Sequence, residues 1–342
     1  MIRGVSVIIC TYNGAERLPE TIRHLFLQEV SSDIPWEIIL VNNASTDNTV
    51  ETTKYEISKY PDKELNFRIV DQPIPGKINA VKKGFFEAKF ESIILCDDDN
   101  WLYPDYIRLA AEIMLSDLLI AVIGGSGIYE PEIPCLKEIE GFERYYVNGP
   151  QEWASTQHWV YGASAVYRKS VFIDLINSKW QLITTGRTGN KLNGGEDAEF
   201  CFMAYLKGYK IISDDRLKFR HFVPLKRQKI SYIINLNFWL SYSNVLLNSY
   251  FAILYKNELP FKTIINKWLL TSFRVLIKQL AFLCIQKIVT FNRLTVKQKI
   301  NFQSSFGTFC ALFYNRKKII DHHNLIKLLI EPNEVTFKKA NK

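Results

Sequence analysis

Short apolar segments alternate with helix-like segments through the first 120 residues, and this alternation is the strongest constraint on the fold. Residues 5–10 (VSVIIC), 37–41 (EIILV), 67–70 (FRIV) and 92–96 (SIILC) have the character of short strands, and the β-branched first run is typical of a strand buried on both faces. Strands connected by helices cross over right-handedly and pair in parallel. The pattern therefore predicts an α/β fold, with a mostly parallel central sheet flanked by helices.

Further elements are expected between and after these strands. Helices are predicted over residues 18–28, 48–60, 78–88 and 105–117, and another begins at Glu196 and ends at Gly208. Additional strands are predicted over residues 120–130, 158–170 and 217–224. The strand–helix pattern thus extends to about residue 224.

Polar residues follow each of the first four strands. The carboxyl ends of parallel strands meet at one edge of a sheet, and ligands bind beyond that edge. Asn, Asp, Ser and Gly also occur in turns for backbone reasons alone, which accounts well for residues 42–48 (NNASTDN). The side chains expected at this edge include Thr11, Tyr12, Asn13, Asn43, Lys77, Asp97, Asp98 and Asp99.

Three consecutive aspartates, Asp97, Asp98 and Asp99, end the fourth strand. A turn gains nothing from three like charges, and clustered carboxylates are costly unless a cation neutralises them. Oxygen ligands suit Mg²⁺ or Mn²⁺, and Mg²⁺ is commonly held by one or two carboxylates together with substrate phosphates. We interpret the triplet as a divalent-metal site that a diphosphate completes. The alternative is a cluster that caps the following helix.

A second acidic pair, Glu196 and Asp197, opens a helix after two glycines. A helix N-terminus favours negative charge, and this helix is too apolar to lie on the surface. An ionised carboxylate held there is a candidate general base, although a plain helix cap has the same pattern. His221 lies in an apolar strand, where a core histidine is the simpler interpretation, but imidazole can also complete a manganese site.

Charge divides the chain near residue 224. Residues 1–222 carry 24 Lys and Arg against 31 Asp and Glu, a net charge of −7, whereas residues 223–342 carry 19 against 4, a net charge of +15. We therefore predict two regions, an acidic body over residues 1–224 and a basic, aromatic-rich helical region over residues 225–342. The six cysteines are scattered without a C-x-x-C pair, and residues 1–10 lack a signal-peptide pattern, which together predict a reducing, cytoplasmic location.

Six segments, taken in order, resemble the family 2 glycosyltransferases, which have the Rossmann-like GT-A fold. They are VSVIICTYNGAERLPETI, EIILVNNASTDNT, GKINAVKKGFFEA, ILCDDDNWLYPDYI, YGASAVYRKS and GGEDAEFCFMAYLKGYKI, and the resemblance covers roughly residues 5–221. It implies an inverting transfer of a sugar from a nucleotide-diphospho-sugar, with a UDP-sugar favoured, to an acceptor hydroxyl in cell-surface polysaccharide or glycan assembly. It also implies Mn²⁺ or Mg²⁺ as the cofactor.

The resemblance further implies roles for individual residues. Asp197 would be the general base with Glu196 beside it, and Asp99, together with Asp97 and His221, would hold the metal. Asn43 stands where the family usually has an aspartate that contacts the nucleotide base, so the identity of the base stays open. The donor pocket would be lined by Thr11, Tyr12, Asn13, Glu16, Asn43, Lys77, Asp97, Asp98, Gly162 and Ala163.

The basic region has a feature of its own, because residues 263–289 place Lys267, Arg274 and Lys278 near one face of an otherwise apolar helix. Each basic residue near an anionic lipid surface contributes about 1 kcal/mol. The region could therefore hold the enzyme peripherally on the inner face of the cell membrane, close to a lipid-linked saccharide acceptor. A compatible interpretation is a helical region that simply packs on the body.

A nucleic-acid-binding protein and an inactive binding module are the classes of function other than an enzyme. The basic region contains no nucleic-acid recognition motif, so no nucleic-acid partner is expected. A catalytically inactive nucleotide-sugar-binding module, or a membrane-surface scaffold with the same fold, stays open as the alternative. The presence of Asp99, Asp197 and His221 favours the enzyme.

Overall fold

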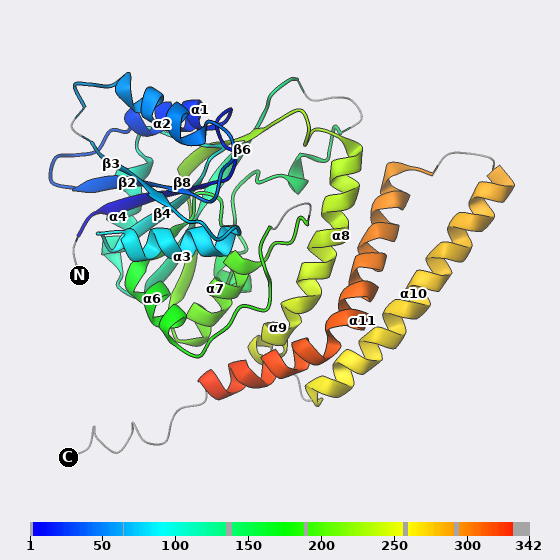
Figure 1. Cartoon of the computed structure of the whole chain (residues 1–342). Helices are drawn as coiled ribbons and strands as arrows, with labels where there is room; N and C mark the ends of the chain where they lie inside the picture. The colour runs from blue at the N-terminus through cyan, green and yellow to red at the C-terminus, as the bar shows by residue number, and fades with distance from the viewer. Residues whose placement is uncertain are drawn as a thin grey trace, which may run out of the picture.

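The computed structural model describes residues 3–63, 65–134, 139–187, 191–255, 259–290 and 294–330, without the side chains of residues 144 and 287–290. Cys135, one of the six cysteines, lies outside these ranges. The described residues form an α/β body and a layer of long helices beside it (Figure 1).

An eight-stranded sheet forms the centre of the body, with strand order β3-β2-β1-β4-β7-β6-β8-β5. The first four strands pair in parallel, as do β6 and β8, whereas β7 is antiparallel to both of its neighbours and β5 is antiparallel to β8. The predicted α/β fold with a mostly parallel sheet is confirmed. The strands are β1 (Val5–Thr11), β2 (Trp36–Asn42), β3 (Asn66–Asp71), β4 (Ser92–Asp97), β5 (Asn100–Leu102), β6 (Ile120–Pro131), β7 (Val166–Arg168) and β8 (Lys210–Val223).

Helices cover both faces of this sheet, which is why its central strands are apolar throughout (Figure 1). In β1, Ile8 packs into one core, and Val7 and Ile9 pack into the other, because successive side chains of a strand point to opposite faces. One face carries α3 (Lys77–Glu87), α6 (Lys169–Asn177) and α7 (Glu196–Leu206), and the other carries α1 (Leu18–Phe26), α2 (Thr49–Ser58) and α4 (Tyr106–Ser116).

Two predicted strands differ from the structure. Over residues 158–170 only β7 is a strand, because His158 and Ser164 have positive φ angles of 60° and 54°, which interrupt an extended chain. The segment before it contains the short 3₁₀ helix η1 (Glu143–Tyr145) and the helix α5 (Ala154–Gln157). The predicted strand over residues 217–224 is the second half of the longer strand β8.

The C-terminal region is helical, as expected. It consists of α8 (Ile230–Leu246), α9 (Asn248–Leu254), α10 (Phe261–Thr290) and α11 (Val296–Ile330). Apolar side chains of α8, α9 and α11 join the core on the α7 face of the sheet. Helix α11 also bonds to the body, because Lys318 Nζ donates to the Ile183 carbonyl oxygen at 2.8 Å, and His322 Nε2 lies 2.8 Å from the Gln181 carbonyl oxygen. The division into two regions at residue 224 stays a prediction.

Helix α10 lies along α11 and turns its other side away from the protein (Figure 1). By length and composition alone, its segment Phe261–Gln286 could span a membrane, since its mean hydropathy is 1.5. Only 11% of this apolar stretch is buried in the protein. The large apolar side chains that this helix exposes are Leu270, Phe273, Val275, Ile277, Leu280, Phe282 and Ile285.

Helices α8 and α11 approach closely at Gly307, where an added Cβ would clash with the backbone carbonyl oxygen of Phe238. Alanine is intrinsically better than glycine inside a helix by about 1 kcal/mol. We nevertheless expect Gly307→Ala to lower the free energy of unfolding by about 1–3 kcal/mol, because the helices must move apart. Urea unfolding measures this change. Gly194→Ala is the control, since its Cβ would meet nothing within 4 Å, and an equal loss in the control would contradict the prediction.

Candidate active site

The acidic triplet lies at the carboxyl end of β4, on the same edge of the sheet as the ends of β1 and β2. The three carboxylates do not share one environment, because each has a different cation from a different element beside it. Arg17 pairs with Asp98, Lys77 lies near Asp97, and Arg227 pairs with Asp99. Arg17 and Arg227 were not among the predicted site residues.

Asp98 is turned into the fold. Its oxygens accept hydrogen bonds from Arg17 Nε at 2.8 Å and from Arg17 Nη2 at 2.7 Å, and Thr11 Oγ1 donates to it at 2.6 Å. Thr21 of α1 donates to the backbone carbonyl of the same residue at 2.9 Å. Asp98 therefore connects α1 and β1 to the end of β4. The predicted donor contacts of Thr11 and Asp98 stay predictions, and in this structure the two side chains bond to each other.

Asp99 and His221 are adjacent, as the sequence analysis expected. Strand pairing places Asn100 opposite His221, and His221 Nδ1 lies 2.8 Å from Asn100 Oδ1 and 3.7 Å from Asp99 Oδ1. Burial lowers the pKa of His221 although Asp99 opposes this, so the ring is mostly neutral at pH 7 and suited to bind a metal. Burial would raise the pKa of Asp99, but the surrounding positive charge outweighs it and the pKa lies below its usual value.

These donors fit a divalent cation whose coordination a substrate completes. Within the described ranges, no group of three or more His, Cys, Asp and Glu side chains stands ready to hold a metal. The Asp99 carboxylate and the His221 ring lie side by side. His221 Nδ1 faces Asn100 Oδ1, an acceptor, so Nε2 is the ring nitrogen left for a metal. Asp97 ends β4 and faces Lys77. A site with so few protein donors resembles those in which substrate phosphates supply further oxygens.

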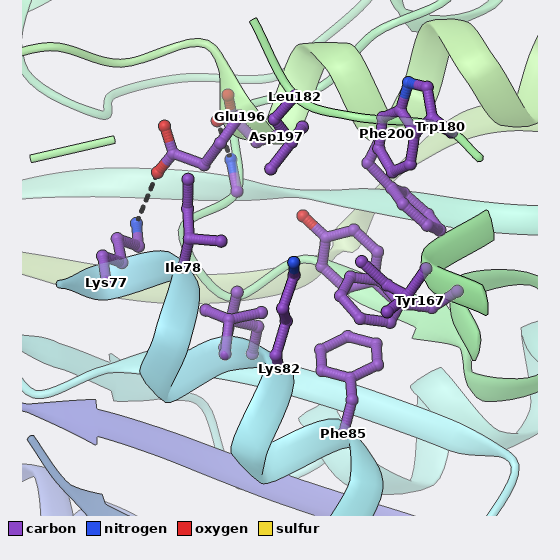
Figure 2. A pocket seen from close by; sticks show the side chains of 15 residues that line it. Lys77, Ile78, Lys82, Phe85, Tyr167, Trp180, Leu182, Glu196, Asp197 and Phe200 are labelled. Carbon is purple, nitrogen blue, oxygen red and sulfur yellow. Dashed lines mark hydrogen bonds and ion pairs between the residues drawn. The ribbon is translucent and has the colours of Figure 1, made fainter. Parts of the chain in front are cut away.

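Lys77 links the triplet to the second acidic pair. Its Nζ lies 3.7 Å from Asp97 Oδ1 and 3.5 Å from Glu196 Oε1, so the end of β4 and the start of α7 are neighbours. Figure 2 shows the contact between Lys77 and Glu196. The charge of Asp97 raises the pKa of Lys77 against the effect of burial, and Glu196 adds to the rise. The structure thereby brings together Lys77, Asp97, Glu196 and Asp197, which lie in three distant segments of the chain.

Asp197 has the environment of a general base. Its Oδ2 accepts a hydrogen bond from the Gly162 backbone N–H at 2.6 Å, and its Oδ1 accepts one from the Ala198 N–H at 2.8 Å. Burial, and then the charge of Glu196, raise the pKa of Asp197 to about 6, while Lys77 opposes the rise. The desolvating surface is a largely apolar cavity beside the two acids, and its walls include Phe85, Tyr167, Phe172, Trp180, Leu182 and Phe200 (Figure 2).

Glu196 adds an oxygen that has no hydrogen-bond partner among the described residues. Its Oε1 lies near Lys77, whereas its Oε2 is buried and accepts no hydrogen bond from any described residue. A buried carboxylate oxygen without a donor is costly. Glu196 is therefore available to a hydroxyl group of a ligand that enters beside Asp197.

The remaining predicted donor residues fall into two groups. Tyr12 is 57% exposed and Glu16 is also exposed, so both are free to contact a ligand. Asn13 bonds to Ser45 and Thr46. Ala163 is buried among apolar side chains. The amide of Asn43 donates to the carbonyl oxygens of Gln72 and Ile74 and accepts from the Gly76 N–H, and its predicted contact with the base stays a prediction.

Comparison with known proteins gives consistent results. The model of the family described as Glycosyl transferase family 2 matches residues 6–176, which is half of the chain. The poly-β-1,6-N-acetyl-D-glucosamine synthase of Staphylococcus aureus (strain COL) is 24% identical over 215 residues, which are 61% of this chain and 48% of that protein. Its namesake from Staphylococcus epidermidis is 25% identical over 179 residues, which are 51% of this chain and 42% of that protein. The chain thus spans about half the length of the curated relatives it matches.

A solved structure also matches the fold. The mannosyltransferase PcManGT from Pyrobaculum calidifontis, in complex with GDP-Man and Mn²⁺, superposes with a TM-score of 0.57 at 18% identity. The match covers 92% of this chain and 89% of that one, so the similarity extends over the C-terminal helices as well.

Gly162 is predicted to be essential for the position of Asp197. An added Cβ at Gly162 would lie 3.0 Å from Asp197 Cβ and 3.3 Å from its Oδ2. We expect Gly162→Ala to displace the carboxylate and lower the turnover of a sugar nucleotide by about 10–100-fold, because displacements of about 1 Å can cost 10²-fold. The initial rate of nucleoside diphosphate release measures this loss. Thermal unfolding checks that the variant stays folded, and unchanged turnover would contradict the assignment.

Proposed function

The chain belongs to glycosyl transferase family 2, and we propose that it transfers a sugar from a nucleotide-diphospho-sugar to an acceptor hydroxyl, with inversion at the anomeric carbon. The observation that carries this proposal is the position of Lys77 between the acidic triplet and the pair Glu196–Asp197. One side of this arrangement suits a metal-bound diphosphate, and the other suits a hydroxyl that must lose a proton. Because Lys77 Nζ lies within 4 Å of both acidic groups, a donor bound at one and an acceptor bound at the other would be close enough for a single displacement.

Asp197 is the proposed general base of this displacement. As the acceptor oxygen bonds to the anomeric carbon, the bond from that carbon to the diphosphate oxygen breaks, and the hydroxyl proton passes to Asp197. The hydrogen bonds from the Gly162 and Ala198 N–H groups hold the carboxylate in place, and the apolar cavity keeps water from solvating it. Glu196 Oε2 accepts a hydrogen bond from a second hydroxyl and so orients the sugar.

Asp99 and His221, together with Asp97 at the end of β4, would hold Mn²⁺ or Mg²⁺. When bound, such an ion neutralises the charge that develops on the leaving diphosphate. Lys77 faces the same region and remains positively charged, so it supports the same diphosphate. Tyr12 and Glu16, exposed at the end of β1, contact the nucleoside.

The relatives support a choice of donor to test first. Two relatives are synthases of poly-β-1,6-N-acetyl-D-glucosamine, which supports a role in cell-surface glycan assembly and an N-acetylhexosamine as the sugar. UDP-N-acetylglucosamine with Mn²⁺ is therefore the first donor to test, followed by other UDP-, dTDP- and GDP-sugars. The acceptor is a glycan or a lipid-linked saccharide.

Asp197→Asn tests the catalytic proposal. Loss of a general base costs about 10²–10⁴-fold in rate, whereas binding of UDP-N-acetylglucosamine, measured by calorimetry with Mn²⁺, is expected to survive. Because a base works only when ionised, and the pKa of Asp197 is raised to about 6, wild-type turnover should decline as the pH falls through 6. The residual activity of the variant should lack this decline.

A matched control is Asp105→Asn, which changes an exposed acid whose partner is Arg108. This control should keep both the rate and its pH profile. Near-normal turnover in Asp197→Asn would refute the proposed base. Failure of every sugar nucleotide to stabilise the wild-type protein against heat would instead favour a different function for the fold.

We also propose that α10 binds the surface of an anionic membrane, which would bring the enzyme close to a lipid-linked acceptor. Its exposed side presents an apolar stripe that includes Leu270, Phe273, Ile277 and Leu280, and helical spacing places Lys267, Arg274 and Lys278 on an adjacent stripe. Since α10 lies along α11, which bonds to the body, this arrangement favours binding in the interface plane over crossing the bilayer.

Sedimentation with vesicles tests this second proposal. Changing Lys267, Arg274 and Lys278 together to Gln removes about 3 kcal/mol of attraction, so binding to phosphatidylglycerol vesicles should weaken by about 10²-fold. The control changes Lys54, Lys89 and Lys179, three exposed lysines of the body, to Gln and should bind normally. Equal losses in both variants, or equal binding of the wild type to neutral phosphatidylcholine vesicles, would contradict the proposal.

A further inference from the structure

Among the described residues, three Arg and Lys side chains form ion pairs with the acidic triplet, and they are not equally fixed. Arg17 meets Asp98 with two nitrogens at 2.7 and 2.8 Å, inside the fold. Lys77 stays 3.7 Å from Asp97 and shares its charge with Glu196. Arg227 meets Asp99 through a single nitrogen, with 2.9 Å between Arg227 Nη1 and Asp99 Oδ2. The pair at Asp99 is therefore short, but it depends on one hydrogen bond.

Arg227 has a fixed backbone and a long side chain. It lies in the turn that follows β8, where its N–H donates to the Pro224 carbonyl oxygen at 2.7 Å and its own carbonyl oxygen accepts from Tyr146 OH at 2.6 Å. Its side chain is 21% exposed, whereas that of Asp99 is 5% exposed. The Arg227 side chain thus reaches solvent in part, while hydrogen bonds hold the backbone of its turn.

The carboxylate that Arg227 occupies is the one best placed to hold a metal together with His221. Arg227 is on Asp99 Oδ2, and a divalent cation on the same carboxylate would repel its guanidinium, so each weakens the binding of the other. A displaced guanidinium then lies beside the oxygens of a diphosphate, and arginine pairs with phosphate through two parallel hydrogen bonds.

We propose that Arg227 exchanges partners during donor binding: it neutralises Asp99 in the empty enzyme, and it turns to the diphosphate when a divalent cation takes its place on Asp99. This inference rests on the proposed function, and it assigns a phosphate-binding residue outside the acidic motifs. The exchange also affects the affinities for metal and diphosphate. Arg227 weakens the binding of metal alone and strengthens the binding of metal with diphosphate, so the two ligands bind cooperatively, each raising the affinity of the other by the same factor.

Calorimetry on the full chain tests the exchange without any catalytic assay. Mn²⁺ is titrated into the protein alone and into the protein saturated with UDP, with a titration into UDP solution as the blank. In the wild type, UDP should tighten Mn²⁺ binding by about tenfold or more, within the usual range of coupling between sites. In Arg227→Gln, Mn²⁺ alone should bind about threefold or more tightly than in the wild type, and the enhancement by UDP should shrink to about threefold or less.

Two further variants separate the exchange from a general effect of charge. Arg220→Gln removes the same charge from β8, where Arg220 Nη1 lies 3.6 Å from Glu130 Oε2, and should leave both affinities unchanged. Arg227→Lys keeps the charge and loses the planar fork, so it should retain weak binding of Mn²⁺ alone but lose part of the enhancement by UDP.

Several results would overturn the exchange. Two of them concern the variants: Mn²⁺ binding that is unchanged or weaker in Arg227→Gln, or an equal gain in affinity in Arg220→Gln. The third is the absence of cooperativity in the wild type, and this test does not depend on a variant being folded. A wild-type protein that binds UDP and Mn²⁺ independently overturns this inference alone. A wild-type protein that binds neither a sugar nucleotide nor UDP, with or without Mn²⁺, overturns the proposed function as well.

Discussion

Neutralisation of three adjacent carboxylates is the constraint on which the candidate site depends. The chain satisfies it with cations from the residue before α1, from the start of α3 and from the turn after β8, so segments about 200 residues apart converge on the end of β4. The pair at Asp98 is internal and connects helix to strand, whereas those at Asp97 and Asp99 face the region where a ligand would bind. Repulsion within the triplet thus becomes a preference for positive charge at that edge.

Asp197 illustrates the opposite use of a carboxylate. An apolar cavity and the nearby Glu196 raise its pKa, while positive charge around Asp99 lowers the pKa of that residue. Two acids of the same kind are therefore suited to different tasks, one to take a proton and the other to hold a cation. Lys77 lies between the two groups, where its charge moderates the repulsion on both sides.

The helical region is connected to this site by buried polar contacts. Glu199, two residues after Asp197, accepts hydrogen bonds from the Ile183 and Thr184 N–H groups and from Tyr250 OH of α9. Trp180 and Leu182 also line the cavity beside the acidic pair. The helices that carry α10 therefore contribute to the shape of the site, apart from the membrane binding proposed for α10.

The sequence by itself determined the strand–helix alternation and the edge where polar residues gather, because these follow from local periodicity and from parallel strand pairing. The adjacency of Asp99 and His221 was implied only by the family resemblance, and the pairing of β5 with β8 produces it. Only the tertiary structure decided which cation pairs with which acid. It also decided that the Asn43 amide bonds to the loop of residues 72–76 and that residues 158–165 are not a strand. The physical reason is range: a strand's pattern repeats every two residues, whereas an ion pair such as Arg227–Asp99 leaves no periodic trace and depends on how the whole chain folds.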